Sequence, residues 1–95
     1  MIEVTEWAAD ILRRTTEAAR RMNPRATVRV QRSAHGVAFL LTDERPEGDA
    51  LVRGEGFELL VEPGLEGVVD VVEPHDRLIL RPPGDPERSV RGPHG

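Results

Sequence analysis

The sequence predicts a compact, mainly β (α+β) domain in which one N-terminal amphipathic helix packs against about six short strands. The chain has 95 residues, which suffices for one domain with one small core. Hydrophobic residues make up 38% of it, yet only Trp7, Phe39 and Phe57 are aromatic, so the core must be aliphatic and tight. The spacing of apolar residues changes from a helical period to a period of two at about Ala26.

A helix is predicted from Glu6 to about Met22. Thr5 is expected to cap it, and Glu6 places a carboxylate in the first turn, where the helix dipole favours negative charge. Helical spacing gives one mainly apolar face, made of Ala8, Ile11, Leu12, Thr15, Ala19 and Met22. The opposite face carries charges that can pair four residues apart: Asp10, Arg13, Arg14, Glu17, Arg20 and Arg21. Asn23-Pro24 ends the helix.

Three arginines gather around the predicted end of this helix: Arg20, Arg21 and Arg25. They allow two interpretations. The cluster can be a docking patch, or the arginines can simply favour the negative end of the helix dipole and solvent.

The strands begin at Ala26. Ala26, Val28 and Val30 alternate with polar residues, which predicts a strand with one buried face. Residues 37–41 are apolar on both faces, which predicts a central strand. Residues 43–48 are a solvated turn, and a hairpin is predicted where residues 50–52 and 57–61 flank a turn with two glycines. A second hairpin joins residues 68–72 to 78–80 around Pro74-His75-Asp76.

The C-terminal segment is poor in apolar residues and rich in proline and glycine. Its only large aliphatic residue after Arg81 is Val90, which buries too little surface to order the segment. We therefore expect one domain over residues 1–83 and a disordered tail over residues 84–95.

Composition disfavours several classes of protein. The net charge is −4, and phosphate binding needs a basic surface, so nucleic acid is not expected as a partner. Nothing approaches the run of about 20 apolar residues that a membrane helix needs, so no membrane contact is expected. The acidic start differs from a secretory signal, and we expect a cytoplasmic protein.

Four segments together carry a resemblance to a known family. They are residues 2–9 (IEVTEWAA), 54–63 (GEGFELLVEP), 68–73 (VVDVVE) and 78–83 (LILRPP). In this order they resemble the A-type iron–sulfur cluster carriers, also called HesB-like proteins or the iron–sulfur biogenesis domain. The resemblance spans roughly residues 2–83. It implies a compact β-sandwich or barrel of about six or seven short strands with one N-terminal helix.

The family holds iron or a cluster through one cysteine in a loop and a Cys-Gly-Cys pair near the C-terminus, and this chain has no cysteine. The family's loop, Cys-Ser-Gly-Phe-x-Tyr, is matched by residues 33–39 (SAHGVAF). The cysteine position falls on Ala34, or on His35 with a slip of one residue. The resemblance therefore implies a degenerate member, without cofactor, in which Ser33, Ala34, His35 and Gly36 are a candidate binding surface.

The sequence gives little support for a histidine metal site or for an enzyme active site. Histidine can bind iron or zinc, but His35, His75 and His94 lie on separate loops and the tail, without the close spacing of a metal site. The chain has no Gly-x-Ser-x-Gly, no P-loop and no dinucleotide-binding glycine motif. We therefore expect that the protein is not an enzyme and has no dedicated metal site.

Three functions stay open on these grounds. The first is a protein of the iron–sulfur biogenesis class that works through contacts with iron–sulfur assembly proteins or with a second copy of itself. The second is a small dimeric interaction or scaffold domain unrelated to iron. The third is a labile mononuclear metal binder that uses His35 with carboxylate ligands.

Overall fold

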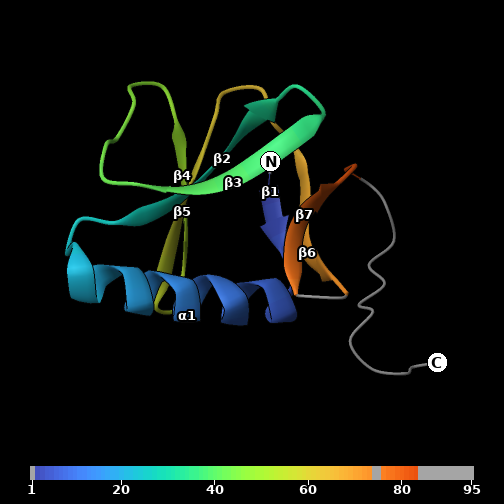
Figure 1. Ribbon diagram of the computed structural model, residues 1–95. Helices are drawn as coiled ribbons and strands as arrows, with labels where there is room; N and C mark the ends of the chain where they lie inside the picture. Colours follow the sequence, from blue (N-terminus) through green and yellow to red (C-terminus); the bar gives the residue numbers. More distant parts are fainter. Residues whose placement is uncertain (1, 74–75, 84–95) are drawn as a thin grey trace.

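Seven strands and one helix make up the described part of the chain. The computed structural model describes residues 2–73 and 76–83. The elements, in chain order, are β1 (Ile2–Val4), α1 (Glu6–Met22), β2 (Thr27–Ser33), β3 (Gly36–Thr42), β4 (Ala50–Gly54), β5 (Phe57–Val61), β6 (Gly67–Val72) and β7 (Arg77–Arg81) (Figure 1). The predicted fold class, mainly β with one N-terminal helix, is confirmed. None of the described helical residues forms a span long and apolar enough to cross a membrane.

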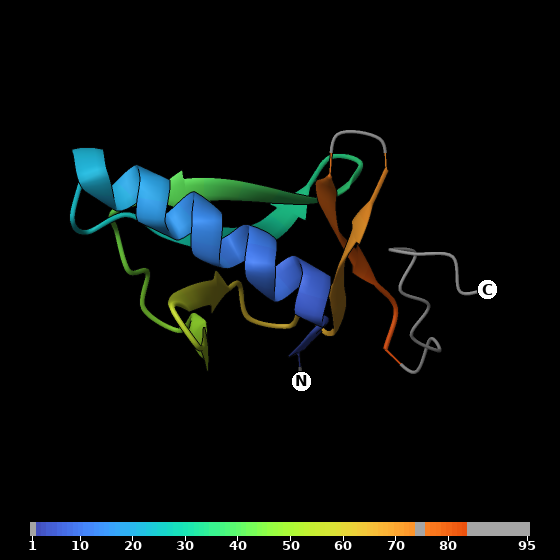
Figure 2. The same cartoon turned by 90° about the horizontal axis from the view of Figure 1, so that it is seen from below.

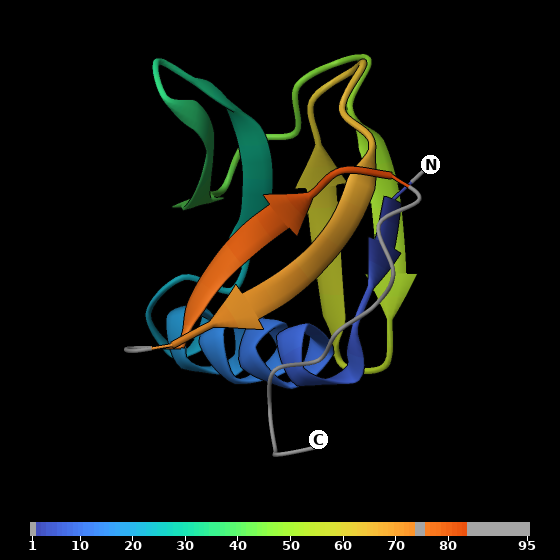
Figure 3. The same ribbon diagram turned by 90° about the vertical axis from the view of Figure 1, so that its right-hand side faces the viewer.

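The strands form two mixed sheets. One has three strands in the order β1-β6-β7, and the other has four in the order β3-β2-β5-β4. Within them, β1 pairs in parallel with β6 and β2 pairs in parallel with β5, whereas the other pairs are antiparallel. The β6–β7 hairpin crosses in front of the four-stranded sheet, with α1 along one end of both (Figure 3). Figure 2 shows α1 crossing in front of the strands, and one core lies between the helix and the two sheets.

The helix begins and ends where the sequence predicts. The Thr5 side chain accepts a hydrogen bond from the Ala8 N–H at 3.2 Å, and Asn23 caps the other end. Helical spacing assigns Met22 to the mainly apolar face of the helix, but its side chain does not join the core and is 87% exposed. The buried stripe runs through Trp7, Ala8, Leu12 and Thr16. Each residue turns the helix by about 100°, so Met22 points about 120° away from Thr16.

The prediction that residues 37–41 form a central strand was wrong. β3 lies at the edge of the four-stranded sheet, and Leu41 is 51% exposed. On one face, Val37 and Phe39 are half-buried against the core. On the other face, Ala38 and Leu40 lie opposite the long side chains of Gln31 and Arg29 on β2. The apolar character of that second face reflects these neighbours and not an additional covering layer.

The core is aliphatic, as its composition predicts. Its buried members come from α1, β2, β5 and β6: Trp7, Ala8, Leu12, Val28, Val30, Phe57, Leu59, Val61, Val69 and Val71. Both predicted hairpins are confirmed by antiparallel pairing of β4 with β5 and of β6 with β7. Pro74, His75 and the tail from residue 84, including His94, lie outside the described residues.

One buried carboxylate connects the start of the helix to the three-stranded sheet. Asp70 on β6 accepts hydrogen bonds from Thr5 Oγ1 at 3.0 Å, from the Val71 N–H at 2.8 Å and from Arg81 Nη2 at 2.6 Å. The Thr5 N–H in turn donates to the Val69 carbonyl at 3.0 Å. Because these groups belong to the helix cap, β6 and β7, the network fixes where α1 starts relative to the sheet.

Candidate functional site

The four positions predicted from the family resemblance lie together at the tip of one hairpin. Ser33 ends β2 and pairs with Gly36, the first residue of β3, while Ala34 and His35 form the turn between them. All four residues are exposed. The turn therefore presents one imidazole and one hydroxyl to solvent, and no thiolate.

An ion pair between Arg32 and Glu62 lies next to this turn, since Arg32 directly precedes Ser33. Glu62 accepts hydrogen bonds from the Arg32 backbone N–H at 2.7 Å and from Arg32 Nη1 at 3.1 Å. These interactions, with the backbone hydrogen bond as the main one, hold the pKa of Glu62 below its usual value. Within residues 2–73 and 76–83, no three His, Asp or Glu side chains gather as metal ligands would. The hairpin tip does not fit an iron–sulfur cluster, which needs thiolates.

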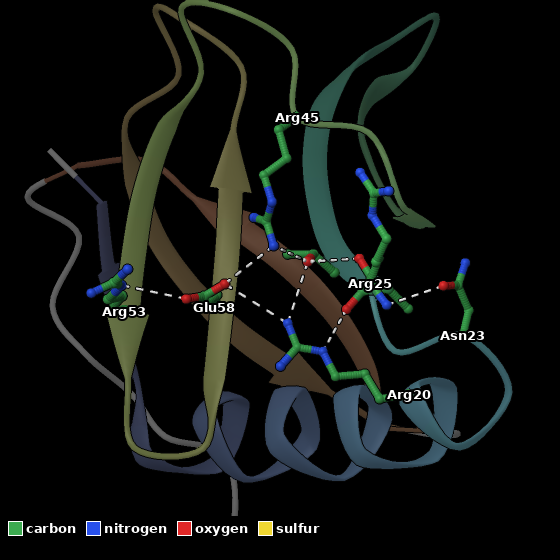
Figure 4. Close-up of polar contacts among 8 residues, drawn as sticks. Arg20, Asn23, Arg25, Arg45, Arg53 and Glu58 are labelled. Atoms are coloured by element: carbon green, nitrogen blue, oxygen red, sulfur yellow. Dashed lines mark hydrogen bonds and ion pairs between the residues drawn. The ribbon is translucent and has the colours of Figure 1, made fainter.

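A second group of charged side chains surrounds Glu58 on β5 of the four-stranded sheet. Three arginines converge on the carboxylate of Glu58, and we call Arg20, Arg45 and Arg53 the arginine cluster (Figure 4). Arg20 Nη2 and Arg45 Nη2 approach Glu58 Oε1 at 3.8 and 3.5 Å, and Arg53 Nε approaches Oε2 at 3.4 Å. Three guanidinium charges thus face one carboxylate, and the four groups together carry a formal charge of +2.

The elements that position the cluster come from distant parts of the chain. Arg20 lies on α1, Arg45 in the loop between β3 and β4, and Arg53 on β4 directly opposite Glu58 on β5. Uncharged acceptors hold two of them. Arg20 Nε donates to the Ala26 carbonyl at 2.8 Å, and Arg45 Nη2 donates to the buried hydroxyl of Thr27 at 3.2 Å. The guanidinium groups therefore do not depend on Glu58 alone for their placement.

Two other arginines in the described part of the chain pair with buried acids, and the geometry of these pairs is different. Arg29 donates to Asp49 through two nitrogens, at 2.7 and 3.0 Å, and this bond raises the pKa of Arg29 above its already high usual value. Arg81 contacts Asp70 at 2.6 Å. Each of these pairs matches one arginine to one buried acid. In the arginine cluster the distances are longer, and the side chains are 38%, 48% and 72% exposed.

The sequence pointed to only part of this cluster. Of the three arginines predicted near the helix end, Arg20 joins it, while Arg21 and Arg25 are exposed. Arg53 and Glu58 were missed, although counting outward from the predicted Glu55-Gly56 turn places them opposite each other. Arg45 carried no such signal, because residues 43–49 follow no repeating pattern that fixes their path.

Comparisons with known proteins are consistent with a fold shared at low sequence similarity. No family model matches the chain, and no curated protein matches it either. Among solved structures, the chain is similar to Escherichia coli SufA, which is described as involved in the biosynthesis of iron–sulfur clusters. The TM-score is 0.64 at 22% identity, and the similarity covers 84% of this chain and 81% of SufA. The chain therefore has the fold of SufA.

Proposed function

We propose that the protein is a non-enzymatic, cytoplasmic, HesB-like protein of the iron–sulfur biogenesis class. In this proposal it works through protein contacts and lacks the family's cysteine ligation of a cluster. The observation that carries it is a SufA-like fold whose Ser33–Gly36 turn holds no thiolate. The same turn is where the family resemblance places a ligand.

Ligand chemistry supports the second half of the proposal. A cluster needs about four ligands, normally thiolates, with histidine as a partial substitute. The turn supplies only His35, so two copies in a dimer would leave half of the ligand positions unfilled. The nearby Glu62 is already engaged by Arg32, and carboxylates are poor donors to sulfide-bridged iron.

We expect the protein to stay colourless after anaerobic incubation with iron, sulfide and a reductant followed by desalting. The measurement is visible absorption together with iron and sulfide analysis. Stable absorption with stoichiometric iron and sulfide would contradict the proposal. Iron or zinc bound in stoichiometric amount without sulfide, and lost in His35→Ala, would instead favour the mononuclear metal binder.

The protein-contact half is tested by affinity capture from the native host with identification by mass spectrometry. Recovery of iron–sulfur assembly proteins, absent from a capture with an unrelated bait of similar charge, supports the proposal. Recovery of proteins without any connection to iron would favour the alternative, an interaction or scaffold domain.

The proposal includes a homodimer, and the sheet edges favour β3 as its contact. Strands at the edge of a sheet are normally protected by charged residues or proline. Three edge strands contain charged residues: β1 has Glu3, β4 has Arg53, and β7 has Arg77 and Arg81. β3 (GVAFLLT) contains no charged residue and no proline, and it exposes Leu41. Two copies of β3 can pair about a two-fold axis, which makes the contact self-complementary.

Sedimentation should therefore give twice the chain mass of 10.5 kDa at high concentration. Leu41→Glu should give only the monomer, because it places a like charge from each copy in the contact. Leu51→Glu is the matched control, since Leu51 is exposed on the opposite edge strand β4. A monomeric wild type, or equal effects of both substitutions, would contradict the assignment of β3.

A further inference from the structure

We propose that the arginine cluster is a docking site for an acidic segment of a protein partner, and that Glu58 acts as an internal competitor for the same arginines. The proposal rests on the proposed function only in that it names the kind of partner that the protein contacts. Four features of the cluster support it.

The first feature is the convergence of the three guanidinium groups. They reach the same point from α1, the β3–β4 loop and β4, and the loop and helix arginines also share the hydroxyl of Thr27, at 3.2 Å for Arg45 and 3.5 Å for Arg20. Figure 4 shows this arrangement in front of β5. A surface arginine that serves only solubility has no reason to meet two others. A preorganised set of donors lowers the entropy that a binding partner must lose.

The second feature is unused donor capacity. Each guanidinium carries five N–H donors, and arginine–carboxylate pairs are strongest when two of them bond in parallel. At Glu58, distances of 3.4, 3.5 and 3.8 Å distribute two oxygens among three arginines. Asp49 shows what a saturated pair looks like in this protein, with two bonds to Arg29 of 2.7 and 3.0 Å. A further carboxylate can therefore bind the cluster more closely than Glu58 does.

The third feature is the sign of the charge. The chain as a whole carries a net charge of −4, whereas the arginine cluster and Glu58 together carry a formal charge of +2. On the outer face of α1 one carboxylate pairs with two arginines and not with three, since Asp10 contacts both Arg13 and Arg14. Complementary charges steer partners and select among them, so a positive site on an acidic protein favours an acidic partner.

The fourth feature separates a protein segment from other anions. Single-stranded nucleic acid is bound with aromatic stacking, but Trp7 and Phe57 are buried in the core and Phe39 is half-buried against it. The arginine side chains are half or more exposed on average, so they form an open surface. A small anion gains little on such a surface, where water screens each contact, whereas a segment with several carboxylates reaches several arginines at once.

Removing the charge of Glu58 should change binding in the direction opposite to removing an arginine of the cluster. Its carboxylate lies on β5 beside Arg53 and holds the arginines when no partner is bound. A partner carboxylate must displace it. Glu58→Gln keeps the shape of the side chain and removes the competing charge, so acidic ligands should bind more tightly.

The test measures binding of a fluorescently labelled hexaglutamate peptide by fluorescence anisotropy at low ionic strength. Arg45→Gln combined with Arg53→Gln should weaken binding by about tenfold, and Glu58→Gln should tighten it several-fold. Arg14→Gln combined with Arg77→Gln is the control with the same change of charge, because both side chains are exposed and neither belongs to the arginine cluster. It should change binding by less than about twofold. Circular dichroism checks that each variant is folded.

Three outcomes would overturn the proposal. Weaker binding in Glu58→Gln would make Glu58 a structural hub that the arginines need. An equal effect of Arg14→Gln combined with Arg77→Gln would mean that the loss of binding reflects net charge alone. Tighter binding of tripolyphosphate or of an oligothymidylate than of the peptide would assign the site to another anion. The assay uses only the purified chain and a synthetic peptide. A negative result here therefore contradicts the docking site alone and leaves the iron–sulfur reconstitution and the affinity capture as separate tests of the proposed function.

Discussion

Asp70→Ala should lower the free energy of unfolding by about 3–5 kcal/mol, because it removes one partner of a buried ion pair and leaves the other behind. The substitution removes one acceptor from the guanidinium of Arg81, one from the hydroxyl of Thr5 and one from the N–H of Val71. Thr5 caps α1, so the loss also loosens the start of the helix. For a domain of this size the change is a large share of the total stability.

Urea denaturation followed by circular dichroism measures this effect. Glu55→Ala, in the exposed turn between β4 and β5, is the control and should change stability by less than about 0.5 kcal/mol. Asp70→Asn should fall between the two, since its amide oxygen still accepts hydrogen bonds but carries no charge. A loss below about 1 kcal/mol in Asp70→Ala would show that the network contributes little beyond its neighbours' packing.

Gly67→Ala should lower the free energy of unfolding by about 2–6 kcal/mol, which combines backbone strain with a steric clash. Gly67 has φ of +140°, and an added Cβ would lie 2.1 Å from the carbonyl oxygen of Arg81. That oxygen belongs to the neighbouring strand β7, so relief requires β6 and β7 to separate. The same residue is opposite Ile2, so the β1 pairing would shift as well.

Gly36→Ala separates the two contributions. Gly36 has a similar φ of +128°, but an added Cβ there would meet nothing within 4 Å. It should therefore lose only the strain, about 1–3 kcal/mol. Thermal or urea denaturation of both variants gives the difference, which measures the clash with Arg81. Equal losses in the two variants would mean that the β6–β7 contact adapts without penalty.

Local signals explain which parts of the fold were predictable. Thr5 and Asn23-Pro24 fixed both ends of α1, and Gly56, with φ of +80°, marked the β4–β5 turn. Each of these depends on residues that are close in sequence. The edge position of β3 was missed because apolar residues on both faces do not reveal whether a strand pairs with one neighbour or with two, and β3 pairs with β2 alone.

The two candidate sites also differ in whether residues close in sequence form them. The Ser33–Gly36 turn follows from the hairpin and the family resemblance, and both are visible in consecutive residues. In the arginine cluster, the Arg53–Glu58 pair follows from the hairpin register, whereas Arg20 and Arg45 reach Glu58 only through the tertiary arrangement. Side chains that meet from separate elements leave no pattern along the chain.

The parallel pairing of β1 with β6 has a consequence for biosynthesis. Residues 2–4 pair with residues 67–69, which are synthesised about 65 residues later. Contacts between residues so far apart form late, since the entropy of closing the intervening chain must be lost before the pairing contributes. A nascent chain that ends before β6 therefore holds β1 without its partner and the Thr5 hydroxyl without Asp70. Translation must pass Val72 before the first strand has a place to bind.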